Sequence, residues 1–173
     1  MKGIIVSSMR ECFVKQYGEE ARNEVLEKAG VRTHKIILDS VDFNDEDLVK
    51  IIDAIVEKTN KKREVLLREF GKYFITIKSQ EIYKQFYRKH SDAKSFLLDM
   101  DKVHTQLTNT IQGAKPPKFT YQEKDDKTIV MEYESHRDMI DYMIGAIEGV
   151  GEVYNQKLDI RKIDNKSVEI RFL

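Results

Sequence analysis

Residues 100–137, MDKVHTQLTNTIQGAKPPKFTYQEKDDKTIVMEYESHR, contain the change of hydrophobic period that decides the fold. Before Pro116-Pro117 the apolar residues stand three or four apart, which predicts one buried helix face made of Met100, Val103, Leu107 and Ile111. After the prolines, residues 118–123 and 127–134 alternate in the manner of strands, and Asp125-Asp126 supplies a turn. The stretch therefore predicts a helix followed by a hairpin.

Helical spacing dominates the chain before this stretch. It predicts helices over residues 2–17, ended by Gly18, and 19–29, ended by Gly30, with 34–41 irregular or extended. Further helices are expected from a cap at Asn44 or Asp45 to about Thr59, and over 62–76, 80–89 and 92–111.

The last part of the chain returns to alternation around one more helix. That helix is expected from Asp138 to about Val150, ended by Gly149 and Gly151. Residues 157–162 and 166–172 follow as strands. The whole predicts one α+β domain over 1–173, with a mostly helical N-terminal lobe and a four-stranded antiparallel sheet with helices in the C-terminal lobe.

Composition excludes several classes of function. Thirty basic and thirty acidic residues leave no net charge, whereas a nucleic-acid-binding protein is usually basic. The single cysteine, Cys12, permits no internal disulfide and fits a reducing compartment. The N-terminus fits neither a signal peptide nor a membrane span, so we expect a cytoplasmic domain without direct membrane contact.

His104 lies in the apolar stripe of the quoted helix. A lone histidine there is more often a core residue that hydrogen-bonds a carbonyl. The functional alternative is an axial ligand of haem, which needs one imidazole nitrogen in an apolar pocket. There is no CxxCH motif for covalent haem, and no second histidine three or four residues away to support zinc.

Two further groups carry polar atoms beside apolar stripes. Tyr133, Ser135 and Arg137 are two residues apart, so on an extended chain they share one face and form a carboxylate-binding set, although an ordinary strand end has the same pattern. Tyr142 stands at the edge of a buried helix stripe, where its hydroxyl reaches either water or a pocket. Motifs for nucleophilic, metalloprotease or nucleotide chemistry are absent from the sequence, and Cys12 has no evident histidine partner.

The motifs in their order resemble the H-NOX family, the haem–nitric oxide/oxygen binding domains related to the haem domain of soluble guanylate cyclase. The resemblance covers essentially the whole chain and rests on MKGIIV, QYGEE, EKAG, REFGKYF, MDKVHTQL, GAKPP, YESHR and YMIGAIEG. It implies haem b between a distal lobe, 1–60, and a proximal lobe, 61–173. It further implies His104 as proximal iron ligand, and a cofactor-binding set of Tyr133, Ser135 and Arg137 for the propionates with Pro117, Ile5 and Met1.

The resemblance also makes Tyr142 the distal donor found in members that bind dioxygen stably. Members that hold dioxygen most tightly add a Trp and an Asn that orient the tyrosine, but Met9 and Phe74 stand at those distal-pocket positions here. Ala146 leaves extra distal room. We therefore expect dioxygen binding that is more fragile than in the best binders.

The implied function is a sensor of dioxygen, nitric oxide and carbon monoxide, not an enzyme. Gas binding would rotate the lobes and signal to an effector protein or fused receptor domain, for which a bacterial methyl-accepting chemotaxis receptor is expected. The alternative is a nitric oxide-selective sensor that regulates a histidine kinase or diguanylate cyclase. The rivals are a haem-free interaction domain and a haem peroxidase, for which His34, His90 and His136 occupy no recognisable pocket position; His136 is expected to be exposed.

Overall fold

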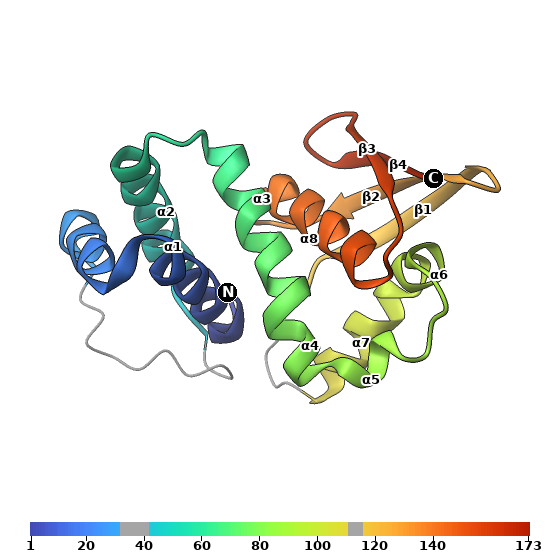
Figure 1. The fold of residues 1–173 in the computed structure, drawn as a ribbon, viewed down its shortest axis with the longest axis horizontal. Coiled ribbons are helices and arrows are strands. Elements are labelled where there is room, and N and C mark those ends of the chain that lie inside the picture. The colour runs from blue at the N-terminus through green and yellow to red at the C-terminus, as the bar shows by residue number, and fades with distance from the viewer. Residues whose placement is uncertain (32–41, 111–115) are drawn as a thin grey trace.

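The computed structural model describes residues 1–31, 42–110 and 116–173, and it has α+β architecture (Figure 1). The helices are α1 (Gly3–Ala29), α2 (Asp45–Thr59), α3 (Arg63–Tyr73), α4 (Ser79–Ile82), α5 (Lys84–Tyr87), α6 (Ala93–Leu98), α7 (Met100–Thr110) and α8 (Ile140–Val153), with a π-helix, η1 (Phe74–Lys78), between α3 and α4. Strands β1 (Lys118–Asp125), β2 (Thr128–Glu134), β3 (Leu158–Lys162) and β4 (Ser167–Phe172) form an antiparallel sheet in the order β1-β2-β4-β3. The predicted fold class and the four strands are confirmed.

Local sequence signals explain the N-terminal helices. α1 is two helical segments joined at Gly18, whose φ of 83° and ψ of 168° interrupt the helix, and Gly30 ends it with φ 65°. The Asn44 side chain accepts hydrogen bonds from the backbone of Glu46 (2.7 Å) and Asp47 (3.2 Å), so it caps α2 as expected. The irregular segment expected at 34–41 lies outside the described residues.

Three helices differ from their expected bounds before the hairpin. The one expected over 80–89 is divided at Tyr83, with φ −115° and ψ 20°, into α4 and α5. The helix expected over 62–76 leaves the α-helical pattern after Tyr73 and continues as η1, a widened turn that periodicity does not reveal. The helix expected over 92–111 is broken at Asp99, with φ −93° and ψ 1°, into α6 and α7.

α8 differs at both ends. Asp138 has φ 49° and precedes the helix, which begins at Ile140 and runs through Gly149 and Gly151 to Val153. Both glycines are sites of close packing: a Cβ atom would lie 2.9 Å from the Ile75 Cβ at Gly149, and 2.9 Å from the Gln156 carbonyl oxygen at Gly151. The prediction that they end the helix is wrong because a buried helix tolerates glycine where a neighbour comes close.

The hydrophobic residues form two clusters. One joins the sheet, α8 and the short helices, and the other joins α1, α2 and one face of α3. Figure 1 shows α1 and α2 on one side, the sheet on the other, and α3 with α8 between them. The α3 residues Leu66 and Phe70 pack with α1 and α2, so α3 contacts both sides of the predicted lobe boundary at residue 60. That boundary stays a prediction.

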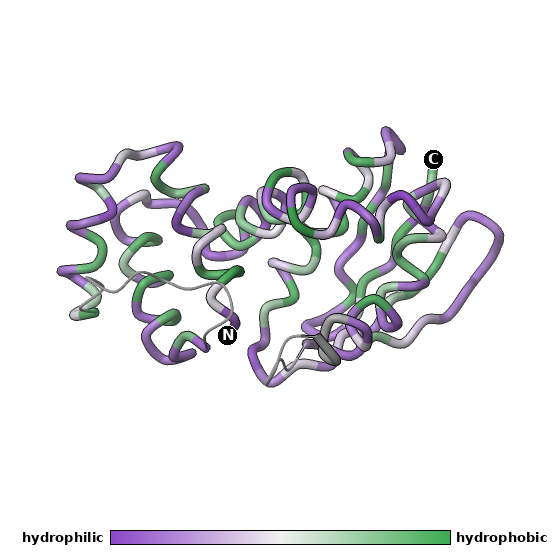
Figure 2. The backbone as a smooth tube through the Cα atoms, turned by 90° about the horizontal axis from the view of Figure 1, so that it is seen from below, coloured by the Kyte–Doolittle hydropathy of each residue, from purple (hydrophilic) through white to green (hydrophobic). Residues whose placement is uncertain are grey.

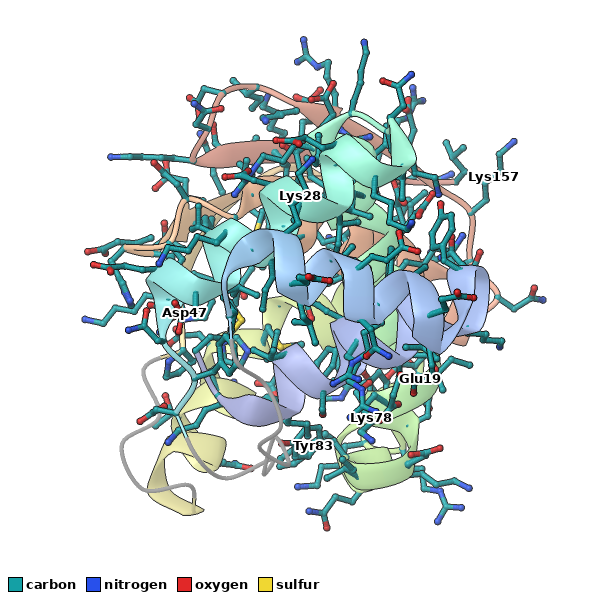
Figure 3. All side chains as sticks on the ribbon, turned by 90° about the vertical axis from the view of Figure 1, so that its left-hand side faces the viewer. Glu19, Lys28, Asp47, Lys78, Tyr83 and Lys157 are labelled. Atoms are coloured by element: carbon teal, nitrogen blue, oxygen red, sulfur yellow. The ribbon has the colours of Figure 1, made fainter. Side chains whose placement is uncertain are left out.

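The surface is polar away from these clusters. The end of the β1–β2 hairpin, at the right of Figure 2, is hydrophilic, and Figure 3 shows charged side chains across the α1 and α2 side, including Glu19 and Lys28. None of the helices within residues 1–31, 42–110 and 116–173 is long and apolar enough to cross a membrane.

Candidate functional site

A cavity of about 480 Å³ opens between the two hydrophobic clusters. Its wall is mostly apolar and comes from α1, η1, α6, α7, the sheet and α8. It brings together nearly all of the predicted site residues: Met1, Ile5, Phe74, His104, Pro117, Tyr133, Ser135, Arg137, Tyr142 and Ala146. A volume of this size suits a cofactor-sized ligand.

His104 enters the cavity from α7. Its Nδ1 lies 3.2 Å from the Pro117 carbonyl oxygen, and because a carbonyl only accepts, Nδ1 must carry the hydrogen. The lone pair therefore belongs to Nε2. Burial lowers the pKa of the imidazole, and the bond to Pro117 and the charge of Asp101 offset this only in part, so the ring is neutral at neutral pH. This is the tautomer that can bind iron.

Tyr133 reaches the cavity from the end of β2, whereas Ser135 and Arg137 reach it from the turn that follows the strand. β2 ends at Glu134, and the Arg137 backbone N–H donates to the Ser135 Oγ at 3.2 Å. The expectation of a shared strand face is wrong because the chain must turn here into α8, although all three residues line the cavity. Burial raises the pKa of Tyr133, which keeps its hydroxyl protonated and able to donate.

Asp45 holds together two cationic groups, the Arg137 guanidinium and the Met1 ammonium. The sequence predicted Asp45 only as a possible helix cap and did not reveal this role. Its carboxylate accepts from Arg137 Nε at 2.9 Å and from the Met1 ammonium at 2.5 Å, and the Met1 nitrogen also lies 2.8 Å from the Phe43 carbonyl oxygen. Burial tends to raise the pKa of Asp45, but the bonds from the N-terminus and Arg137 outweigh it, so the pKa is lowered. His136 lies 3.4 Å from the same carboxylate with 59% of its side chain exposed, as expected, although it also reaches the cavity rim.

Tyr142 brings a hydroxyl from α8 to the cavity wall. Its Oη is buried and has no hydrogen-bond partner among the described residues. Burial raises the pKa of this phenol far above its usual value, so the group remains a donor. A buried polar group left without a partner in a cavity is a strong indication of a bound ligand.

A second hydroxyl pair in the wall was not anticipated. Ser79 Oγ and Tyr87 Oη are 2.6 Å apart and buried. Ser79 donates to the Ile75 carbonyl oxygen at 2.9 Å, so Tyr87 donates to Ser79, and burial raises the Tyr87 pKa to about 12. Ser79 begins α4 and Tyr87 ends α5, so the two residues are eight apart across the break at Tyr83, and no single helical period would have paired them.

Met9 is the predicted distal-pocket residue that the structure places elsewhere. It lines a separate hollow of about 50 Å³ with Phe13 and Phe70, inside the α1–α2–α3 cluster. The correction follows from helix geometry, because Met9 lies four residues after Ile5 but the cavity ends at the first turns of α1.

The residues present fit haem. A neutral imidazole provides an iron ligand, a guanidinium with two hydroxyls provides donors for carboxylates, and the remaining wall is apolar. The orphan Tyr142 hydroxyl provides one donor for a small ligand at the iron.

The comparisons with known proteins agree with this chemistry. The family model described as Haem-NO-binding matches residues 2–162. The chain is 30% identical to an oxygen-binding H-NOX domain related to soluble guanylate cyclases, solved as its oxygen complex; the match covers 99% of this chain and 95% of that one, with a TM-score of 0.83. A Cs H-NOX mutant with 4-cyano-L-phenylalanine at site 5 is also 30% identical, with a TM-score of 0.87 and coverage of 99% and 96%.

A curated relative is longer than this chain. The chain is 23% identical over 163 residues to soluble guanylate cyclase gcy-32 of Caenorhabditis elegans, a match that covers 92% of this chain but 24% of that protein. The chain spans about a quarter of the length of this relative, whereas it matches the solved H-NOX domains over nearly their whole length. The chain therefore belongs to the haem-NO-binding, or H-NOX, family, as a gas sensor domain whose cofactor is haem.

Proposed function

We propose that this domain senses dioxygen through haem b held by His104, with Tyr142 as hydrogen-bond donor to the bound gas. When bound, haem supplies a ferrous iron that takes up dioxygen, nitric oxide or carbon monoxide. The observation that carries the proposal is the buried Tyr142 hydroxyl, which has no partner among the described residues and lies in the same cavity as His104.

Each residue of the cavity has a separate task. His104 would hold the iron through Nε2, and the Pro117 carbonyl fixes the ring by accepting from Nδ1 at 3.2 Å. Arg137, with the hydroxyls of Tyr133 and Ser135, would bind the propionates. Pro117, Ile5 and Met1 would pack on the porphyrin, and Phe74 and Ala146 would complete the distal wall; all five line the cavity.

Selectivity follows from charge. Bound dioxygen carries more negative charge than bound nitric oxide or carbon monoxide, so a donor in a dry cavity favours dioxygen. One such bond contributes about 1–3 kcal/mol, or a factor of roughly 5–150 in affinity. Phe74 cannot hydrogen-bond Tyr142, and Met9 lies outside the cavity, so the gas would be the hydrogen-bond partner of the Tyr142 hydroxyl and the complex would be fragile.

The signal would pass to another protein. We propose that gas binding moves the helical lobe against the sheet lobe and that the output goes to a methyl-accepting chemotaxis receptor in a bacterial cytoplasm. The lack of an orienting partner for Tyr142 favours one alternative, a nitric oxide-selective sensor that regulates a histidine kinase or diguanylate cyclase. Burial raises the pKa of the one thiol, Cys12, so we do not propose it as a nucleophile.

The test compares the dissociation rates of dioxygen and carbon monoxide from the ferrous protein. We expect Tyr142→Phe to speed dioxygen loss by roughly 5–150-fold and to leave carbon monoxide nearly unchanged. Tyr17→Phe, on α1 and away from the cavity, is the matched control. Equal dioxygen rates in the two variants would favour the nitric oxide-selective alternative.

A further inference from the structure

His90 follows α5, outside the cavity, and both of its ring nitrogens face acceptors. Nδ1 lies 3.0 Å from the Phe86 carbonyl oxygen and Nε2 lies 3.2 Å from Asp99 Oδ2, with the side chain only 11% exposed. The carbonyl requires hydrogen on Nδ1, and a neutral ring would then turn the Nε2 lone pair toward the carboxylate. The ring completes both bonds only as the imidazolium.

Asp99 is the residue at which α6 ends and the helix that carries His104 begins. Its carbonyl oxygen accepts from the Val103 N–H at 3.0 Å, in the first turn of α7, and its Oδ1 lies 2.7 Å from Lys102 Nζ. The pKa of the Asp99 carboxyl is lowered, mainly by the hydrogen bond from Lys102. Burial offsets this in part, and the bond from His90 adds to the lowering. Asp99 therefore ties the end of α5 to the start of α7.

The ring of His90 also touches the cavity wall from behind. It meets the Phe96 ring edge-on, with centroids 5.5 Å apart and planes at 89°, and Phe96 lines the cavity. Among the described residues, Asp99 pairs with both His90 and Lys102, and Lys89, the residue before His90, places its ammonium 5.4 Å from the centroid of the Phe86 ring. Figure 1 shows α5, α6 and α7 gathered at one end of the molecule.

We propose that His90 is a positioning residue for the iron ligand: its imidazolium holds Asp99, and through Asp99 it sets where α7 presents His104. The proposal rests on the proposed role of His104 as iron ligand. The clamp is closed when both ring nitrogens of His90 carry hydrogen and loosens when Nε2 loses its hydrogen, so the position of His104 would depend on pH. The domain would then answer the same gas differently at different pH.

The experiment is resonance Raman spectroscopy of the ferrous, gas-free, haem-loaded protein between about pH 5 and 8. We expect the iron–histidine stretching band of the wild type to shift with pH. His90→Gln and Asp99→Asn should stay at the alkaline position, and His90→Arg, which keeps a double donor with a charge, should stay near the acid position. Asp53→Asn, on α2, should follow the wild type. Loss of the iron–histidine bond under nitric oxide should rise on the order of two- to thirtyfold in His90→Gln.

Two results would overturn the proposal: a wild-type band that does not move with pH, or a His90→Gln band that still moves. A band absent from the wild type, or kept in His104→Gly, would instead reject His104 as ligand. If a variant fails to load haem, nitrogen-15 NMR spectra of the carbon monoxide complex of the wild type test the proposal, because they report which His90 ring nitrogens carry hydrogen. Hydrogen on both His90 ring nitrogens near pH 6 supports the clamp, and a neutral ring over the whole range excludes it.

Discussion

The Tyr142 hydroxyl is a buried donor that the folded protein leaves without a partner among the described residues. Such a group costs about 1–3 kcal/mol of folding free energy. We expect Tyr142→Phe to raise the unfolding free energy of the gas-free protein by about 1 kcal/mol, measured by urea denaturation, while it weakens dioxygen binding. Tyr87→Phe is the matched control, because it removes a donor that Ser79 uses and should destabilise by a similar amount. Destabilisation by both variants would mean that Tyr142 already has a partner.

His104 gives the site a pH dependence whose sign follows from burial. Burial is the largest cause of its lowered pKa, so the unfolded chain, with the ordinary value of 6.5, binds more protons than the folded one just below that pH. The contribution to stability is complete above pH 6.5 and falls as the pH drops through that value toward the folded pKa. Iron on Nε2 excludes the proton still further and keeps the same sign. The urea concentration at the unfolding midpoint of the haem-loaded protein should therefore decrease as the pH is lowered from about 7 to 5.5. His104→Gln should make this decrease smaller. If the change of the urea midpoint with pH were the same in His104→Gln, the pH dependence would have to come from other titrating groups.

Close packing of α3 on α8 sets the position of Tyr142 at the scale of elements. A Cβ at Gly71 would lie 2.0 Å from the Tyr142 carbonyl oxygen, and one at Gly145 would lie 2.0 Å from that of Arg68. Helix propensity alone predicts that alanine stabilises each site by about 1 kcal/mol. We expect the opposite sign, a loss of about 3 kcal/mol or more for either Gly→Ala variant by urea denaturation, because two backbones must separate. A gain would show that the helices separate freely.

The same contacts explain which elements the sequence could predict. The strands, the Asn44 cap and the Gly18 interruption follow from local pattern and were predicted. The extension of α8 through Gly149 depends on Ile75 of another helix, and η1 and the Asp99 break show no local signal. In the site, helical spacing placed His104 and Tyr142 beside apolar stripes, and the family resemblance gave their roles. Asp45 reaches Arg137 from 92 residues away, and no pattern in the sequence pairs them.

Among the described residues, several ion pairs join the α1–α2 side to the rest of the molecule, and two of them lie beside the cavity-forming elements η1 and α8. Glu11 on α1 pairs with Lys78 at the end of η1 at 2.8 Å, and Asp45 on α2 pairs with Arg137 at 2.9 Å. Lys78 is labelled at the foot of α1 in Figure 3. A lobe movement driven by gas would have to shift these ion pairs. The free energy available for the movement is the difference in gas affinity between the two lobe arrangements.

The proposed lobe movement can be tested directly because the chain has one cysteine, Cys12, which is buried. Spin labels at Val49→Cys on α2 and Ile163→Cys beyond β3 would sit at exposed positions, 46% and 47% accessible, on the two sides of the molecule. We expect the distance between them, measured by pulsed electron resonance, to change when nitric oxide is added to the ferrous protein. The control pair Glu123→Cys with Ile163→Cys lies within the sheet lobe and should not change. Identical distance distributions with and without nitric oxide would exclude lobe rotation as the signal, although they would not affect the proposed haem chemistry. We would then look for the output at the cavity rim, where Asp45 joins Met1 to Arg137.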